Sequence, residues 1–296
     1  MRVLLAAGLC GGVAAALPAQ RAEMAMDHGQ MTAPARPLTA HVRDQIAAAH
    51  RAALLLDTPE KARAAGYRPR FGDVPLQGIH YSNPLLVLSG KFDIDHPPTL
   101  MFIPVDDTMQ LVGVAYTYEI KDGNAVPDGF DGAAMWHEHP ALSLPGHRLV
   151  MTHVWFVDSP NGPFAHDNPT LPFVERDMHY PPAGWLDAET TRNLALALSL
   201  AARQAPGGGR LNLGPRSDSA VNVLARERDT VGAQAQRLEA LEQAGRKADY
   251  QRLAVTIGSE TGALVATIKA IPSDSLNRAV LGRLIDESPS EHMAKP

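Results

Sequence analysis

Cysteine is almost absent from this chain: the 296 residues contain only Cys10. It lies in a segment with the parts of a cleavable signal peptide, namely Arg2, an apolar run over residues 3–17 and a small-residue exit before Gln20. We therefore expect a mature chain without cysteine. That excludes disulfides, c-type haem attachment and thiolate metal sites. A metal ion would have to be held by His, Asp, Glu, Met or Tyr.

Long apolar runs and clustered positive charge are missing as well. The run over residues 3–17 is shorter than the roughly 20 residues that span a bilayer, and no later segment is more apolar. The net charge is −5 and no basic stripe is present, so we expect no nucleic-acid partner. HExxH, nucleophile-elbow, phosphate-loop and calcium-loop motifs are all absent, which leaves serine and cysteine hydrolases without support. The sequence predicts an exported protein, periplasmic or secreted, with no transmembrane segment.

Composition divides the chain into four parts. They are a signal peptide at 1–20, a flexible tether at 21–37, an α+β metal-binding domain at 38–182 and a helical hairpin region at 183–296.

The tether contains four side chains that suit copper: Met24, Met26, His28 and Met31. Thioethers and imidazoles together favour this metal, especially as Cu(I). The alternative is an ordinary linker that happens to contain methionine.

Periodicity predicts an α+β fold, with a mostly antiparallel β-sheet core, an N-terminal helix and a C-terminal helical hairpin. Residues 38–65 and the chain after Asp187 have helical spacing. Turn residues separate short runs of strand formers. The predicted strands cover residues 85–88, 99–105, 109–120 and 148–157.

Histidine is the residue type that carries the chemistry, with twelve copies. On a strand, His137 and His139 share one face and Glu138 takes the other, so the two imidazoles can converge on one metal. The loop after His139 contains Pro140, Pro145 and Gly146, and we expect it to place His153 opposite His137 or His139.

His80 is the most plausible fourth donor, and the predicted metal ligands are therefore His80, His137, His139 and His153. Surface histidines or hydrogen-bonded core histidines remain the alternative.

Several phrases resemble an uncharacterised family of exported bacterial proteins with a domain of unknown function. They are G-x-H-Y-x-N-P at 78–84, L-V-G-V at 111–114, H-x-W at 153–155 and the run S-P-N-G-P-F-A-H-D-N-P at 159–169. The resemblance spans about residues 60–173 and implies that His80 and His153 matter. This chain has Ala115 where an acidic residue is usual, although Glu119 lies on the same strand face. Residues 132–139 and 160–166, the latter ending at His166, also echo cupin metal motifs, without the cupin glutamate.

These observations predict an exported transition-metal-binding protein whose cofactor is a copper or zinc ion. One alternative is a metalloenzyme that keeps an open coordination position on a three-histidine metal. The other is a structural or partner-binding module without metal. The expected partners are the metal ion, a small molecule in the enzyme case, and a second copy through the C-terminal helices.

Overall fold

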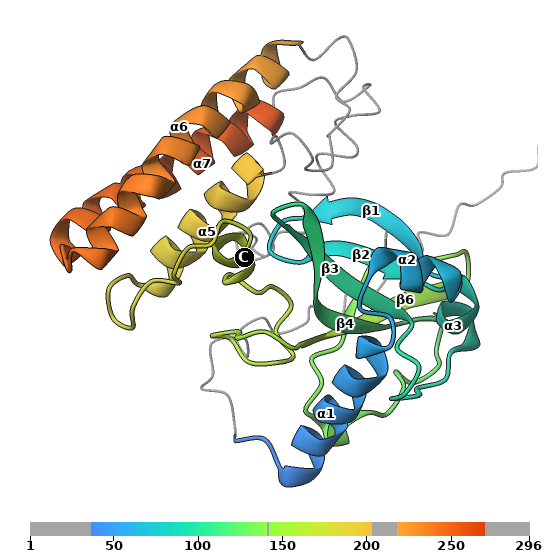
Figure 1. Cartoon of the computed structure of the whole chain (residues 1–296). Coiled ribbons are helices and arrows are strands. Elements are labelled where there is room, and N and C mark those ends of the chain that lie inside the picture. Colours follow the sequence, from blue (N-terminus) through green and yellow to red (C-terminus); the bar gives the residue numbers. More distant parts are fainter. Residues whose placement is uncertain (1–36, 141, 203–217, 270–296) are drawn as a thin grey trace, which may run out of the picture.

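The computed structural model describes residues 37–140, 142–202 and 218–269 (Figure 1). The expected signal peptide and the four copper-type side chains of the tether lie outside these residues. Within the described ranges, no helix is both long and apolar enough to cross a membrane.

One six-stranded antiparallel sheet forms the centre of the fold, in the order β1-β2-β3-β4-β6-β5. The hairpin between β3 and β4 closes with two residues, because Val105 pairs with Thr108. Helices precede the sheet and follow it, which confirms the α+β class. The strands are β1 (Arg68–Val74), β2 (Gly78–Ser82), β3 (Thr99–Val105), β4 (Thr108–Lys121), β5 (His137–Glu138) and β6 (His147–Trp155).

Three predicted strands are confirmed as β3, β4 and β6, but the predicted strand at 85–88 is wrong. These residues belong to helix α3 (Pro84–Ser89). Asn83 caps this helix, since its side-chain oxygen accepts a hydrogen bond from the Leu85 amide (3.1 Å). Pro84 occupies the first turn, and Gly90 ends the helix with φ +63°.

The N-terminal helical segment is confirmed as α1 (Ala40–Leu54) and α2 (Pro59–Ala64). The Thr39 hydroxyl caps α1 and the Thr58 hydroxyl caps α2. Helix α1 covers one face of the sheet, where Val42, Ala49 and Ala53 are buried in the same apolar cluster as β3 and β4 residues.

The other face of the sheet is covered by the chain that follows β6. Ala165 and Leu171 lie there in one buried cluster with Met101, Ala115 and other sheet residues. Both faces of β6 are therefore buried, as its continuous apolar pattern predicts.

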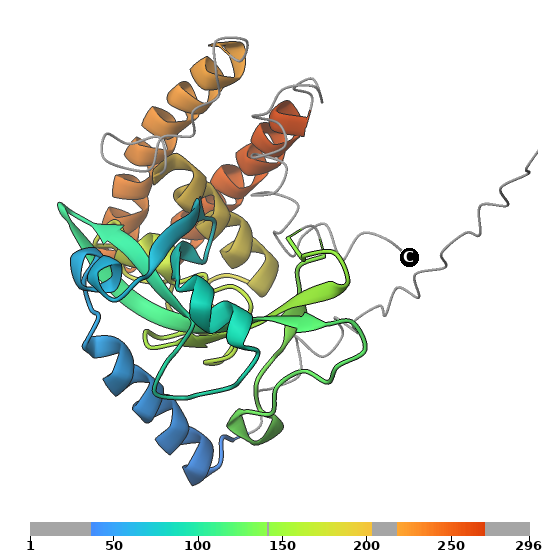
Figure 2. The same ribbon diagram turned by 90° about the vertical axis from the view of Figure 1, so that its right-hand side faces the viewer.

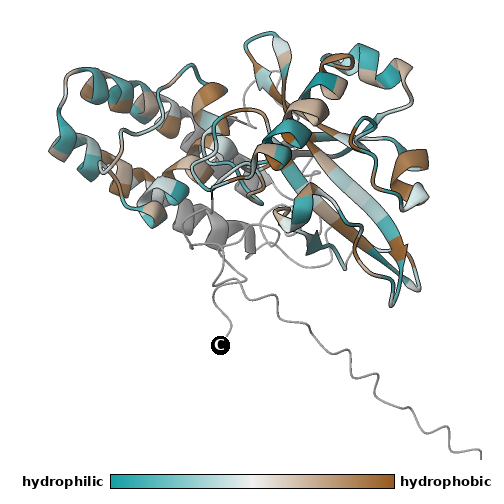
Figure 3. Ribbon diagram, turned by 90° about the horizontal axis from the view of Figure 1, so that it is seen from below, coloured by the Kyte–Doolittle hydropathy of each residue, from teal (hydrophilic) through white to brown (hydrophobic). Residues whose placement is uncertain are grey.

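The C-terminal helices form a second apolar core, whose buried residues include Leu194, Leu238 and Tyr250. Leu76, from the β1–β2 connection, and Phe173 also belong to this core. The helices are α4 (Leu171–Val174), α5 (Ala188–Ala202), α6 (Asp218–Gln243) and α7 (Lys247–Lys269), and α6 and α7 form the expected hairpin. In both views α1 lies below the sheet, whereas α6 and α7 lie to its upper left in Figure 1 and above it in Figure 2. These helices carry both hydrophobic and hydrophilic residues (Figure 3), as expected of amphipathic helices with one face on the apolar core.

Candidate metal centre

Curling of the sheet brings His80 on β2 close to His153 on β6. Two strands separate β2 from β6, a distance of about 14 Å in a flat sheet. The two ring centroids nevertheless lie 5.6 Å apart, so the strands coil around this face. β4 carries Gly113 and Ala115 beneath the rings, and a Cβ at Gly113 would lie 2.7 Å from the Val154 carbonyl oxygen. The small residues on β4 therefore leave the space in which the rings of His80 and His153 approach each other.

The edge strand β5 supplies the next two rings. His137 pairs with Met151 and Glu138 with Val150, and the His139 amide continues the ladder by donating to the Leu149 carbonyl oxygen (2.9 Å). His137 and His139 therefore share one face, as their spacing predicts. Their ring centroids lie 4.9 Å apart. Glu138 lies on the other face and forms an ion pair with Arg148.

The predicted register of His153 is wrong, although its face is correct. His153 lies two residues beyond Met151 and is therefore the diagonal neighbour of His137, with ring centroids 5.2 Å apart. The loop after His139 runs to Arg148, and a loop of this length pairs His139 with Leu149, which cannot set His153 opposite either histidine. The Ser143 hydroxyl bridges the His139 carbonyl and the Leu149 amide.

Glu119 holds the same loop, because its carboxylate accepts from the Leu144 amide (2.5 Å). This buried glutamate is on the histidine face, as the sequence predicts, but its role there is structural. Ala115 takes the position directly opposite His153, where its small side chain leaves room for the ring.

A fifth histidine, His166, joins the group and was not among the predicted ligands. Its ring centroid lies 4.4 Å from that of His137 and 5.6 Å from that of His153. We refer to His80, His137, His139, His153 and His166 as the histidine cluster.

Backbone hydrogen bonds place the segment that carries His166. Trp155 on β6 donates its amide to the Pro163 carbonyl and its indole N–H to the Ala165 carbonyl (2.8 and 2.7 Å). The Asn168 amide donates to the Leu76 carbonyl oxygen (2.9 Å). The H-x-W phrase and the run at 159–169 therefore share one structural role. Hydrogen bonds between them hold the segment that carries His166 against the histidine face of the sheet.

The ring spacings match those of imidazoles around one metal ion. A metal–nitrogen bond of about 2.0–2.1 Å places each ring centroid about 3.2 Å from the metal, so rings bound at about 90–120° have centroids about 4.5–5.5 Å apart. Five of the ten ring pairs have centroids 4.4–5.6 Å apart: His80–His153, His137–His139, His137–His153, His137–His166 and His153–His166. The nitrogens are less convergent than the rings, because no three of them lie within 4.8 Å of one another among the described residues. Ring rotation would be needed for joint coordination.

His153 has the protonation pattern of a ligand. Its Nδ1 donates to the His166 carbonyl oxygen (2.6 Å), which leaves the lone pair of the neutral ring on Nε2. That Nε2 atom is buried and makes no hydrogen bond to the described residues. Metal-binding histidines are commonly oriented in this way by a carbonyl group on the second nitrogen.

Burial favours the neutral form of His137, His139 and His153. It is the main cause that lowers the pKa of His137 and of His153 well below the usual 6.5, with the His166 ring as the next cause for both. Burial and the neighbouring rings lower the pKa of His139 to about 3. Only neutral imidazoles bind metal ions, so the site is prepared for that chemistry.

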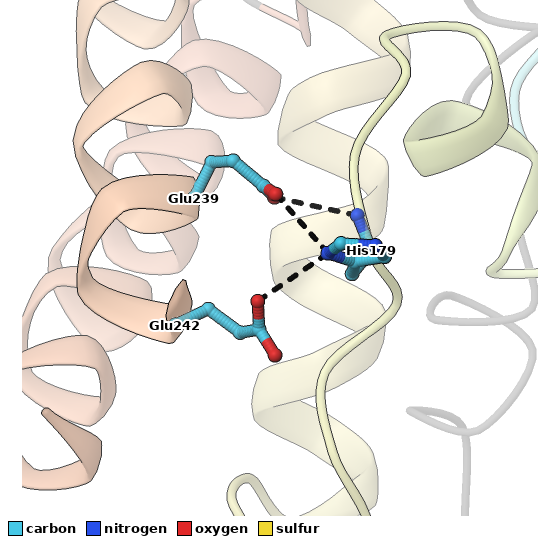
Figure 4. Close-up of side chains that lie close together, drawn as sticks. All are labelled: His179, Glu239 and Glu242. Carbon is cyan, nitrogen blue, oxygen red and sulfur yellow. Dashed lines mark hydrogen bonds and ion pairs between the residues drawn. The ribbon is translucent and has the colours of Figure 1, made fainter. Parts of the chain in front are cut away.

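A second group of metal-capable side chains lies beside α6, and we refer to it as the His179 group: His179, Glu239 and Glu242. Their ligand atoms all lie within 4.8 Å of one another, so the group could hold a metal ion. His179 Nδ1 lies 3.1 Å from Glu239 and 3.4 Å from Glu242 (Figure 4). The His179 side chain is 71% exposed.

Histidines outside these groups have other contacts. His96 pairs with Asp93 at an exposed site (2.9 Å), and His147 donates to the Pro145 carbonyl oxygen (3.1 Å). His50 stacks on Phe156.

Comparison with known proteins gives no relative: no family model, no curated protein and no solved structure matches the chain. The site must therefore be interpreted from its own chemistry.

Proposed function

We propose that this is an exported protein that binds a transition metal ion, copper or zinc, through His80, His137, His139 and His153. The observation that carries the proposal is the gathering of imidazoles at ligand spacing, with buried ring nitrogens on His137, His139 and His153 and with His153 Nε2 left without a hydrogen bond. A buried polar atom without a partner costs about 1–3 kcal/mol. A bound cation would remove that cost. Neutral nitrogen donors suit zinc and copper better than calcium or magnesium, which prefer oxygen.

Two thioethers on the same face favour copper over zinc. Met101 is the cross-strand partner of His80, and Met151 is the partner of His137. Both methionines are buried. Soft thioether and imidazole donors together suit copper, in particular Cu(I), so copper is the metal we place first.

Binding is favoured over catalysis by the number of donors. The metalloenzyme alternative needs a coordination position that protein ligands do not fill. Four imidazoles are enough to complete a tetrahedral set, which is the arrangement of a closed site. The exposed His179 group is the second candidate for the ion.

Elemental analysis of protein purified from an exporting host, without added chelator, tests the proposal. We expect about one equivalent of copper or zinc in the wild type and none in His137→Ala or His153→Ala. His96→Ala is the matched control, because it removes a histidine that lies outside both groups, and it should retain the metal. A wild type that carries neither ion and binds neither on titration would contradict the proposal.

The exported location has its own test. N-terminal sequencing of the recovered protein should begin within a few residues of Gln20. A functional cytoplasmic protein that retains Met1 would contradict export.

A further inference from the structure

His166 has a carboxylate partner, the side chain of the adjacent Asp167. Its Nδ1 lies 2.9 Å from Asp167 Oδ1. A carboxylate only accepts hydrogen bonds, so Nδ1 donates, and the lone pair of the neutral ring is on Nε2. This is the hydrogen bond that orients many metal-bound histidines.

Asp167 is itself fixed in place. The Gln77 side-chain amide donates to Oδ1 (3.0 Å), and Arg192 of α5 lies 3.7 Å from Oδ2. The Asp167 side chain is only 9% exposed. A carboxylate that is buried and held from two elements is a stable support for the His166 ring.

His166 also contacts the cluster through its backbone. Its carbonyl oxygen accepts the hydrogen bond from His153 Nδ1, while its ring lies 4.4 Å from His137 and 5.6 Å from His153. One residue thus orients a predicted ligand and presents its own imidazole at ligand spacing.

From this geometry we infer that His166 is a fifth metal ligand, oriented by Asp167. The inference rests on the proposed metal-binding function and extends it, because it adds a donor that the strand pattern does not supply. It also connects the metal to the helical region through Arg192.

The test compares metal binding by four variants. The metal-free full-length protein is titrated with Zn(II) in competition with a chromophoric chelator. We expect His166→Ala to weaken binding at least tenfold and Asp167→Asn to weaken it by about 10–100-fold, the usual effect of removing an orienting group. The matched controls are His96→Ala and Asp93→Asn, an exposed imidazole–carboxylate pair with the same 2.9 Å contact. They should bind as the wild type does.

Co(II) distinguishes a ligand from a residue that only supports the fold. Loss of a ligand changes the position and intensity of the visible Co(II) bands, so His166→Ala should differ from wild type while His96→Ala should not. If the wild type binds Zn(II) and His166→Ala shows the same affinity or the same Co(II) spectrum, His166 is not a ligand and the proposed function stands. If the wild type binds neither Zn(II) nor copper, the proposed function itself fails. Should His166→Ala not fold, as judged by near-UV circular dichroism, Asp167→Asn decides by the same criteria.

Discussion

The histidine cluster on the sheet and the His179 group beside α6 each meet a different half of what a metal site requires. The His179 group has convergent ligand atoms, all within 4.8 Å, but His179 is largely exposed. The cluster has the burial, the ring spacing and the oriented tautomers, but its nitrogens are less convergent. The convergence of ligand atoms thus favours the His179 group as the metal site, whereas burial favours the histidine cluster.

The two groups differ in whether interactions other than metal binding can account for their side-chain positions. A histidine between two glutamates is attracted to them without any metal, and the His179 amide also donates to Glu239 (3.3 Å). The His179 group is accounted for as an ion pair that ties a loop to α6. Neutral imidazoles can hydrogen-bond to one another, but the buried Nε2 of His153 has no hydrogen bond to the described residues, and a buried nitrogen without a partner is a cost. A bound cation would account for the buried Nε2 of His153, which is why we place the proposed ion at the cluster.

The largest expected effect is stabilisation by metal. Adding Cu(II) or Zn(II) at about 1,000 times the dissociation constant should stabilise the wild type by about 4 kcal/mol, measured as a shift in the urea midpoint. His153→Ala should lose this shift. The double variant Glu239→Gln/Glu242→Gln should keep it. If the double variant loses the shift and His153→Ala keeps it, the metal binds at the His179 group.

The stability of the metal-free protein should depend on pH in a defined direction. His139 has a pKa of about 3 when folded and about 6.5 when unfolded, so below pH 6.5 the unfolded state binds more protons. Stability is therefore complete above pH 6.5 and falls as the pH decreases toward 3. His139 alone should cost about 2 kcal/mol between pH 6.5 and 5.

Urea unfolding in the presence of a chelator measures this effect. His139→Gln should reduce the pH dependence, whereas Glu239→Gln should leave it as in wild type. A urea midpoint that does not change between pH 6.5 and 5 would show that the cluster is not buried in the neutral form.

The smallest expected effect is that of breaking the ion pairs of the His179 group. Glu239→Gln should change the free energy of unfolding by less than about 1 kcal/mol, because exposed pairs contribute little. Metal content should be unchanged. A loss of several kcal/mol, or of the metal, would mean that this group does more than hold a loop.

Local patterns predicted much of the site, and contacts between distant residues determined the rest. Strand alternation placed His137 and His139 on one face, and parity placed His153 with them. The register failed because a loop that runs to Arg148 pairs His139 with Leu149, and this sets Met151 rather than His153 opposite His137.

His166 was missed because hydrogen bonds from Trp155 and to Leu76 carry its segment across the sheet. Two signals in the sequence pointed to it: the adjacent Asp167 and the echo of a cupin metal motif that ends at His166. The helix at 84–89 could have been recognised from Asn83-Pro84, a cap followed by proline, which outweighs a short apolar run.

X-ray absorption spectroscopy of protein loaded with one equivalent of copper or zinc tests the central claim most directly, because it reports the ligands themselves. The account predicts a first shell of nitrogen at about 2.0–2.1 Å, with the outer-shell scattering of at least three imidazole rings. His166→Ala should reduce that imidazole contribution. A first shell dominated by carboxylate oxygen with a single imidazole would place the ion at His179, Glu239 and Glu242, and would contradict the account.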